Sequence, residues 1–473
     1  MKSGHRTDFP VIHTTSKNCK SAELIAKLRQ FIAVICLGPI SFGASLNWTS
    51  PTLPQLQNPN STLPFSVTVA EGSWMASMLA FGVLTAAIPS GYLADRLGPK
   101  LCVLALVFPH LLFTIIVALA EDVYLLCLAR FISGISSGGV SVISPIYIAD
   151  IADDSLRGTL GTFFELLTFV GVIFVSTIGA YVRYVALTFV MGGVALMCGI
   201  VFLFFPESPT YLLKINKTEK AIAALRFYRS DNCDVAKNLE EMTTGLKLLQ
   251  QRTPKVNLKK ALLSKPVIRG LIACSGITIF QQLSAVDAII FYTVSIFETA
   301  DTKLDSYNSA IAITVSQLFG AILILFLIEK AGRRFFLFVS VGICGISLLV
   351  LATFFHLKHL EIDIIGMNYI PLLTLIAFSI GFTLGLGPIP WMVNGELFLH
   401  EIKGIANGIT ITLNWVFLFM VTKTLPTAME EFGHHIPFYF FSVCMAVCIV
   451  FIYFCIPETR GKTLEQIQIE LNA

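Results

Sequence analysis

The stretch Gln281-Gln282-Leu283-Ser284-Ala285-Val286-Asp287 places two amides, a hydroxyl and a carboxylate in the middle of a mainly apolar run, residues 266–297. About 20 apolar residues are enough for a helix to cross a bilayer, so the run predicts a membrane span. Lipid offers polar groups no hydrogen-bonding partner, so these side chains are expected to face protein or water. A lone Gln in such a helix usually joins neighbouring helices. Polar residues at 281, 282, 284 and 287 recur at helical spacing, which favours a site for a polar ligand.

The composition predicts a protein that crosses the membrane many times. Of 473 residues, 55% are hydrophobic and 13% charged, and the mean hydropathy is +0.77. No soluble class has that balance. The first 30 residues are polar and basic and the first apolar run is a full span, so no cleavable signal peptide is expected. The eleven Cys are expected to be small apolar fillers, because nine lie in apolar segments.

Apolar windows predict an all-α membrane protein with twelve transmembrane helices. The windows are residues 31–50, 73–94, 101–120, 123–148, 159–182, 185–205, 266–298, 308–330, 335–356, 368–395, 403–425 and 435–456. With both termini in the cytosol, 28 of the 33 Lys and Arg lie on the cytosolic side. This excess fixes the orientation, because basic residues are retained in the cytosol.

Matched motifs indicate that the chain is an internal duplication. Three pairs recur at corresponding loops: 95–100 with 329–334, Asp150 and Arg157 with Glu396 and Lys403, and 206–208 with 457–459. They predict two pseudo-symmetric six-helix bundles with a ligand held between them, the major facilitator architecture. The expected parts are an N-terminal tail (1–30), a first bundle (31–205), a cytosolic helical linker (206–265), a second bundle (266–456) and a C-terminal tail (457–473).

The repeated motifs bring carboxylates close to cations at the cytosolic ends of the spans. Charges that only orient the chain would explain Lys and Arg but not the acids, which contribute little to orientation. We therefore expect a network of weak ion pairs that closes the cytosolic side as a gate. Its expected members are Asp95, Arg96, Asp150, Arg157, Glu207, Glu329, Arg333, Arg334, Glu396, Lys403 and Glu458.

These motifs resemble the sugar porter family of the major facilitator superfamily over residues 31–467. The resemblance rests on the segments 95–100, 130–134, 145–147, 157–161, 206–209, 281–284, 329–334, 387–391, 414–415 and 457–463. Within the family, the segments 290–294 and 414–415, followed by 421–424, look most like insect facilitated trehalose transporters. Thr210, Pro99 and Lys403 stand where the family usually has Arg, which implies a looser cytosolic gate.

The resemblance implies which side chains hold the sugar. Amides both donate and accept hydrogen bonds, as hydroxyls do, and an aromatic face covers the C–H surface of a pyranose. The implied binding residues are Gln281, Gln282, Gln317, Asn414, Trp391 and Phe382. Asp287 and Glu165 are also implied there, although the family usually has Asn and Gln at those positions. The resemblance further implies an outer gate at Ile290 and Phe291 of a broken span 7, and a hinge at 385–390 in span 10.

The expected function is uniport of trehalose or a hexose such as glucose across the plasma membrane. Span 1 lacks the acid that proton-coupled sugar porters carry there. Asp287 and Glu165 keep a proton symporter open, and a non-transporting sugar sensor is a further alternative. Asn60 is an expected glycosylation site on the outer side. The sequence predicts no enzyme, cofactor, metal site or nucleic-acid partner. The expected partners are the sugar and the bilayer, and the expected functional unit is a monomer.

Overall fold

A computed structural model describes residues 16–58, 66–153, 156–229, 239, 242–244, 264–362, 367–398, 400–458, 460, 462 and 466. Its regular elements are helices, and the described ranges contain no strand. Twelve described stretches are long and apolar enough to cross a membrane. This confirms the predicted all-α fold of twelve spans.

The first six spans are built from eight helices. These are α1 (Ser16–Cys36), α2 (Pro39–Asn47), α3 (Thr49–Gln57), α4 (Val69–Leu97), α5 (Pro99–Ala118), α6 (Val123–Ile151), α7 (Arg157–Gly179) and α8 (Tyr184–Phe202). Span 1 is the joined run α1–α3, which reaches from Leu24 to Gln57 and exceeds the predicted window at both ends. A left-handed Gly38 separates α1 from α2. The apolar window missed α3 because it is rich in Thr, Ser, Gln and Pro, although most of its side chains are buried.

The last six spans also contain eight helices. These are α13 (Lys265–Gln282), α14 (Val286–Ala300), α15 (Ser306–Ala331), α16 (Arg333–His359), α17 (Ile370–Leu384), α18 (Ile389–Glu396), α19 (His400–Phe432) and α20 (His435–Cys455). Spans 7 and 10 are each made of two helices, α13 with α14 and α17 with α18. Nine described Cys are free and buried or half-buried, which agrees with their predicted role as apolar fillers.

Two short helices follow the first bundle along the chain, α9 (Pro209–Lys214) and α10 (Thr218–Tyr228). They pack on the first bundle. The side chain of Gln30 donates to the Tyr228 carbonyl (2.8 Å), and the hydroxyls of Tyr147 and Tyr228 are 2.6 Å apart. Burial raises the pKa of Tyr228 well above its usual value, so this hydroxyl stays neutral. We call the side with α9 and α10 the predicted cytosolic face and the opposite side the predicted outer face.

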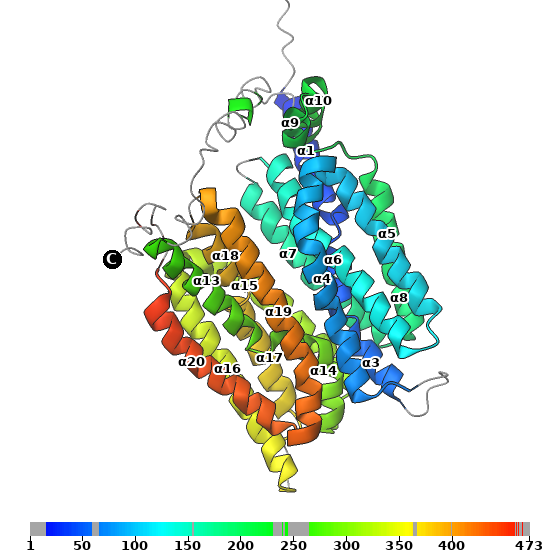
Figure 1. Cartoon of the computed structure of the whole chain (residues 1–473), viewed down its shortest axis with the longest axis vertical. Helices are drawn as coiled ribbons and strands as arrows, with labels where there is room; N and C mark the ends of the chain where they lie inside the picture. The colour runs from blue at the N-terminus through cyan, green and yellow to red at the C-terminus, as the bar shows by residue number, and fades with distance from the viewer. Residues whose placement is uncertain are drawn as a thin grey trace, which may run out of the picture.

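The two bundles lie side by side, blue to cyan for the first and green to red for the second (Figure 1). Contacts between them run along α4 with α19 and α7 with α15, and α3 meets α14. In Figure 1 the bundles lean apart toward the end that carries α9 and α10, and they approach each other at α3 and α14. The internal duplication relates span 2 to span 8 and span 5 to span 11. The contact of span 2 with span 11 therefore corresponds to the contact of span 8 with span 5, as expected of two related bundles.

Candidate functional site

Span 7 is interrupted at the stretch that opened the sequence analysis. Helix α13 ends at Gln282, the middle of the span Lys265–Ala300, and α14 begins at Val286. Ala285 has φ +64°, a left-handed conformation that is uncommon for a residue with a Cβ. The Ser284 hydroxyl donates to the Gln281 carbonyl (2.7 Å) and satisfies one acceptor freed by the break.

Span 10 breaks at residues 385–388, as the predicted hinge requires. A Cβ on Gly385 would lie 2.5 Å from the Phe336 carbonyl oxygen, so only glycine fits there without movement. The amide of Leu386 donates to the Ser340 hydroxyl (2.9 Å), and the amide of Gly387 donates to the Phe382 carbonyl (2.9 Å). The turn is therefore held in one shape although it is not helical.

Gln281 joins these two breaks to span 11. Its amide nitrogen donates to the carbonyls of Leu386 (2.7 Å) and Gly387 (3.1 Å), and its oxygen accepts from the Asn414 amide (3.0 Å). Gln281 and Asn414 are 4% and 3% exposed. The helical gaps thus leave backbone carbonyls in mid-membrane that an amide side chain satisfies. In this conformation Gln281 connects helices, the role that the sequence left as its alternative.

Gln282 and Asp287 form a second pair across the span 7 break. Their side chains lie close to each other, and an amide can donate to a carboxylate. Gln282 is buried and Asp287 is half-buried. Asp287 also lies in the first turn of α14, where the helix dipole favours a negative charge. An acid at 287 therefore has a local structural reason besides any role toward a substrate.

The other predicted binding residues lie on α7, α15, α17 and α18. Gln317 on α15 is 2% exposed, and its side-chain oxygen has no hydrogen-bond partner among the described residues. Trp391 on α18 is 42% exposed, whereas Phe382 on α17 is 9% exposed. Glu165 is exposed on α7 of the first bundle, and its side chain makes no hydrogen bond or ion pair with a described residue.

The predicted outer gate lies on α14. Phe291 is fully buried and Ile290 is half-buried. Just after them, Tyr292 departs from helical geometry (φ −118°, ψ 16°). This kink within α14 is the second irregularity of span 7, after the break between α13 and α14. The Tyr292 hydroxyl donates to the Thr422 carbonyl on α19 (2.8 Å).

The charged motifs on the predicted cytosolic face cap helices as well as forming ion pairs. Glu207 accepts the backbone amide of Lys100 (2.8 Å) at the start of α5, after Gly98 with φ +96°. Glu458 repeats this at the start of α16, where it accepts the amides of Arg333 (3.2 Å) and Arg334 (3.0 Å). The matching sites confirm that the repeated motifs build the same local structure twice. Sequence alone did not show it, because spacing does not reveal which donor a carboxylate meets.

Ion pairs on this face form within each bundle. Lys214 contacts Asp95 (3.0 Å) and Arg333 contacts Glu396 (3.2 Å). The Ser208 hydroxyl donates to Asp150, and the Arg96 guanidinium lies 5.0 Å from the Tyr92 ring centroid. Arg157 is exposed at the start of α7. The side chains of Glu329 and Lys403, and all of Asn60, lie outside the described residues.

Arg130 on α6 is a buried cation that sequence reasoning left without a role. It is 0% exposed and donates through Nη1 to the Ser45 carbonyl (2.6 Å), 5.3 Å from the Trp48 ring centroid. Its Nε and Nη2 have no hydrogen-bond partner among the described residues, and no described carboxylate pairs with it. Residues 31–51 of span 1, which contact it, contain no acid.

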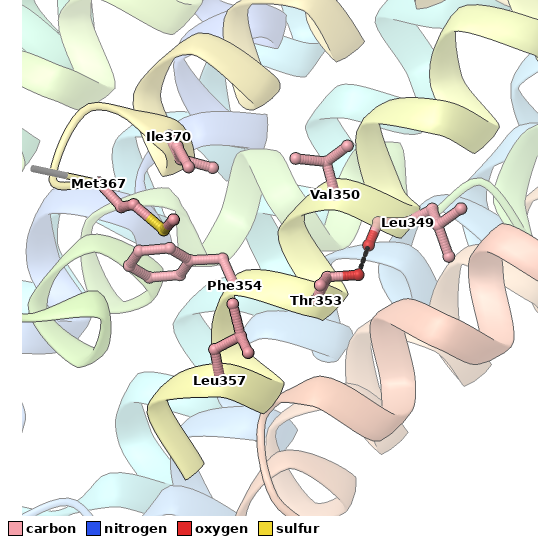
Figure 2. Close-up of a pocket in the computed structure, with 7 residues that line it drawn as sticks. All are labelled: Leu349, Val350, Thr353, Phe354, Leu357, Met367 and Ile370. Atoms are coloured by element: carbon pink, nitrogen blue, oxygen red, sulfur yellow. Dashed lines mark hydrogen bonds between the residues drawn. The ribbon is translucent and has the colours of Figure 1, made fainter. Parts of the chain in front are cut away.

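A separate hollow of about 310 Å³ lies at the predicted outer ends of α16 and α17 (Figure 2). Its lining is apolar except for Thr353, whose hydroxyl donates to the Leu349 carbonyl (2.8 Å). Such a surface offers nothing to sugar hydroxyls. Within the described ranges, no group of His, Cys, Asp or Glu has an arrangement that could hold a metal ion.

Twelve spans in two related bundles, with broken helices and buried amides at mid-membrane, define a membrane carrier. The family model described as "Sugar (and other) transporter" matches residues 31–471, and the chain belongs to this family. Facilitated trehalose transporter Tret1 of Polypedilum vanderplanki is 31% identical and covers 93% of this chain and 87% of its own length. The Apis mellifera ligustica protein of that name is 28% identical over 97% of this chain and 91% of its own.

Solved structures show the same fold. The inward-open xylose transporter XylE from E. coli has a TM-score of 0.76 at 20% identity and covers 93% of this chain and 98% of its own. The proton:xylose symporter XylE bound to 6-bromo-6-deoxy-D-glucose has a TM-score of 0.70 at 22% identity, with 94% and 99% covered. The chain is a multi-pass membrane protein of the sugar transporter family, and members of this family are transporters rather than enzymes.

Proposed function

We propose that this chain carries trehalose or a hexose such as glucose by facilitated diffusion, through alternating access of its two bundles. The observation that carries the proposal is the mid-membrane junction of Gln281 with Asn414 and the span 10 break. Polar side chains at mid-membrane are costly in free energy, so a junction built from them indicates a functional site. Curated relatives at about 30% identity are named facilitated trehalose transporters, which supports the choice of sugar.

In the proposed mechanism the sugar competes for the bonds of this junction. A hydroxyl both donates and accepts, so it can replace the Asn414–Gln281 contact with little net loss. Because Gln281 also holds the Leu386 and Gly387 carbonyls, its movement would loosen the turn of span 10. Occupancy of the site is thereby linked to the hinge, as required of a ligand that shifts a conformational equilibrium.

The remaining proposed contacts follow from unused polar groups. Gln317 has an unpartnered buried oxygen, which a sugar hydroxyl would satisfy. Gln282 and Asp287 offer a donor and an acceptor beside it, and the exposed Trp391 offers a ring face. Glu165 is proposed to accept a hydroxyl from the opposite bundle. Phe382 supports the turn from behind, since its carbonyl accepts the Gly387 amide.

The gates are proposed at both ends of the path. Ile290 and Phe291 close the outer side from α14. On the cytosolic side, closure would bring together the charged motifs of the two bundles that here pair within each bundle. Individually weak, solvated pairs suit a closure that must reopen.

The test is uptake of labelled sugars by oocytes that express the chain, with Gln282→Leu as the site variant. Trehalose and glucose should enter faster than in control oocytes, and Gln282→Leu at equal surface level should abolish the difference. Normal uptake by that variant would remove the assigned site. Surface expression without uptake of any mono- or disaccharide in a broad panel would reject the carrier.

Uniport is proposed because Arg130 has no carboxylate partner and span 1 supplies none. A second candidate, proton symport, is favoured by Glu165 and Asp287, which are two carboxylates without a cation partner among the described residues. Vesicles with an imposed pH gradient separate the two. A uniporter brings internal sugar only to the external level, whereas accumulation above that level requires coupling to protons.

The proposed location is the plasma membrane, with both termini in the cytosol and the monomer as the working unit. The bias of Lys and Arg supports this orientation. Asn60 would then carry a glycan. Asn60→Gln should abolish the mobility shift that glycosidase treatment produces, and an unchanged shift would place the glycan elsewhere.

A further inference from the structure

Lys423 on α19 reaches across the boundary between the bundles near their predicted outer ends. Its ammonium donates to the Ser73 hydroxyl on α4 at 2.8 Å, and it lies 4.7 Å from the centre of the neighbouring Trp74 ring. The Ser73 hydroxyl gives its own proton to the Ala70 carbonyl (2.7 Å), so its oxygen is oriented to accept from Lys423. The Ser73 hydroxyl and the Trp74 ring, both on α4, therefore face the Lys423 ammonium.

The contact continues as an aromatic seam toward the membrane centre. The ring of Phe419, one turn before Lys423, lies 6.1 Å from Trp74 and 6.3 Å from Phe81. Lys423 makes no ion pair with a described carboxylate. A lysine near a span end usually extends toward water. Here its ammonium turns toward the other bundle, which is unexplained if it serves only to anchor the span.

A second pair of polar side chains lies between the bundles at the same end. Tyr307, at the start of α15, lies close to the side chain of Gln55 on α3. On the predicted cytosolic face, the described ion pairs Lys214–Asp95 and Arg229–Asp153 join α9 and the end of α10 to the first bundle, and Arg333–Glu396 lies within the second bundle. The polar contact of Lys423 with Ser73 thus joins the two bundles at the predicted outer end.

We propose that Lys423, Ser73 and Trp74 form an outer clasp that holds the carrier closed to the outside and opens each time the site faces outward. The proposal rests on the alternating access proposed above. A cation on an aromatic face suits a reversible clasp, because both partners remain stable when parted: the ammonium regains water and the ring stays in the membrane interface. A buried ion pair would leave two costly charges behind.

The experiment measures how often the outer side opens. Ser77 lies one turn below Ser73, is 0% exposed, and donates to the Ser73 carbonyl (2.8 Å). Ser77→Cys in otherwise unchanged protein provides a thiol that a membrane-impermeant maleimide reaches only when α4 and α19 separate. Intact cells would be labelled with and without this Cys, so that labelling of native thiols can be subtracted. Lys423→Met removes the charge and keeps the chain length, and Lys423→Arg is the matched control that keeps a cation.

Lys423→Met is expected to raise the labelling rate of Ser77→Cys roughly tenfold, the size expected for losing a cation–π contact and its hydrogen bond. Lys423→Arg is expected to label at the parent rate. Equal rates for Lys423→Met and the parent would overturn the clasp. If Lys423→Met does not reach the surface, Ser73→Ala decides instead: a severalfold rise supports the clasp and an unchanged rate rejects it.

Labelling needs no transported sugar, so the outcome is independent of the uptake assays. A chain that transports nothing can still show faster labelling in Lys423→Met, in which case the clasp stands and the proposed function falls. A chain that transports sugar with unchanged labelling keeps the function and loses the clasp.

Discussion

Replacing Gln281 by Leu tests the junction between the two broken spans. The change removes three hydrogen bonds, to the carbonyls of Leu386 and Gly387 and from the Asn414 amide. Each buried polar group left without a partner costs about 1 kcal/mol or more, and bonds between membrane helices average somewhat below that. The expected loss in the free energy of unfolding is therefore about 2–3 kcal/mol.

The assay is thermal unfolding of the purified protein in detergent. The quantity measured at each temperature is the fraction of protein that stays monodisperse. In a chain of this length the loss corresponds to a drop in midpoint of about 2–3 °C. Gln282→Leu is the matched control, because it lies one residue away and makes no bond to span 10. It should lower the midpoint less than Gln281→Leu does, although it is expected to abolish transport. Equal midpoints for the two variants would refute the structural role given to Gln281.

Three further changes probe the same framework. Ala285→Gly should preserve or raise the unfolding midpoint, whereas Ala285→Val should cost about 1–3 kcal/mol, because a branched side chain is strained at φ +64°; similar midpoints would remove the strain argument. Glu207→Ala and Glu458→Ala should each cost about 1–2 kcal/mol, since each loses the cap of a helix start, and the Gln variants should cost less. Asp287→Asn should keep uptake within about threefold because an amide oxygen still accepts hydrogen bonds at that position, whereas Asp287→Leu should abolish it. Uptake by the Leu variant would exclude 287 from the site.

Much of the fold could be predicted from hydropathy alone. Uninterrupted apolar windows such as 101–120 and 435–456 agree closely with α5 and α20, because in lipid a helix is the way for one segment to satisfy its own backbone. Span 1 was underestimated, because α3 buries Thr, Ser and Pro that a hydropathy window scores as a loop. The break in span 10 was predictable from its Gly and Pro, which disfavour helix on their own.

The details of the site were less predictable. Periodicity treated 281–287 as one helical face, whereas the chain breaks after Gln282 and turns through a left-handed Ala285. An Ala carries no signal for that conformation, so the pairing of Gln281 with span 10 could not be foreseen. Nothing in the sequence indicated the clasp at Lys423, because its hydrogen-bond partner Ser73 lies 350 residues away along the chain. Contacts of this kind depend on tertiary packing, which one sequence does not display.

Counterflow in liposomes that contain only the purified chain tests the central claim most directly. Vesicles loaded with unlabelled trehalose would be diluted into a trace of labelled trehalose, without any ion gradient. The account predicts a transient rise of labelled sugar above its final level, which requires an alternating site, and the absence of that rise in Gln282→Leu. A slow monotonic entry in both proteins would contradict it.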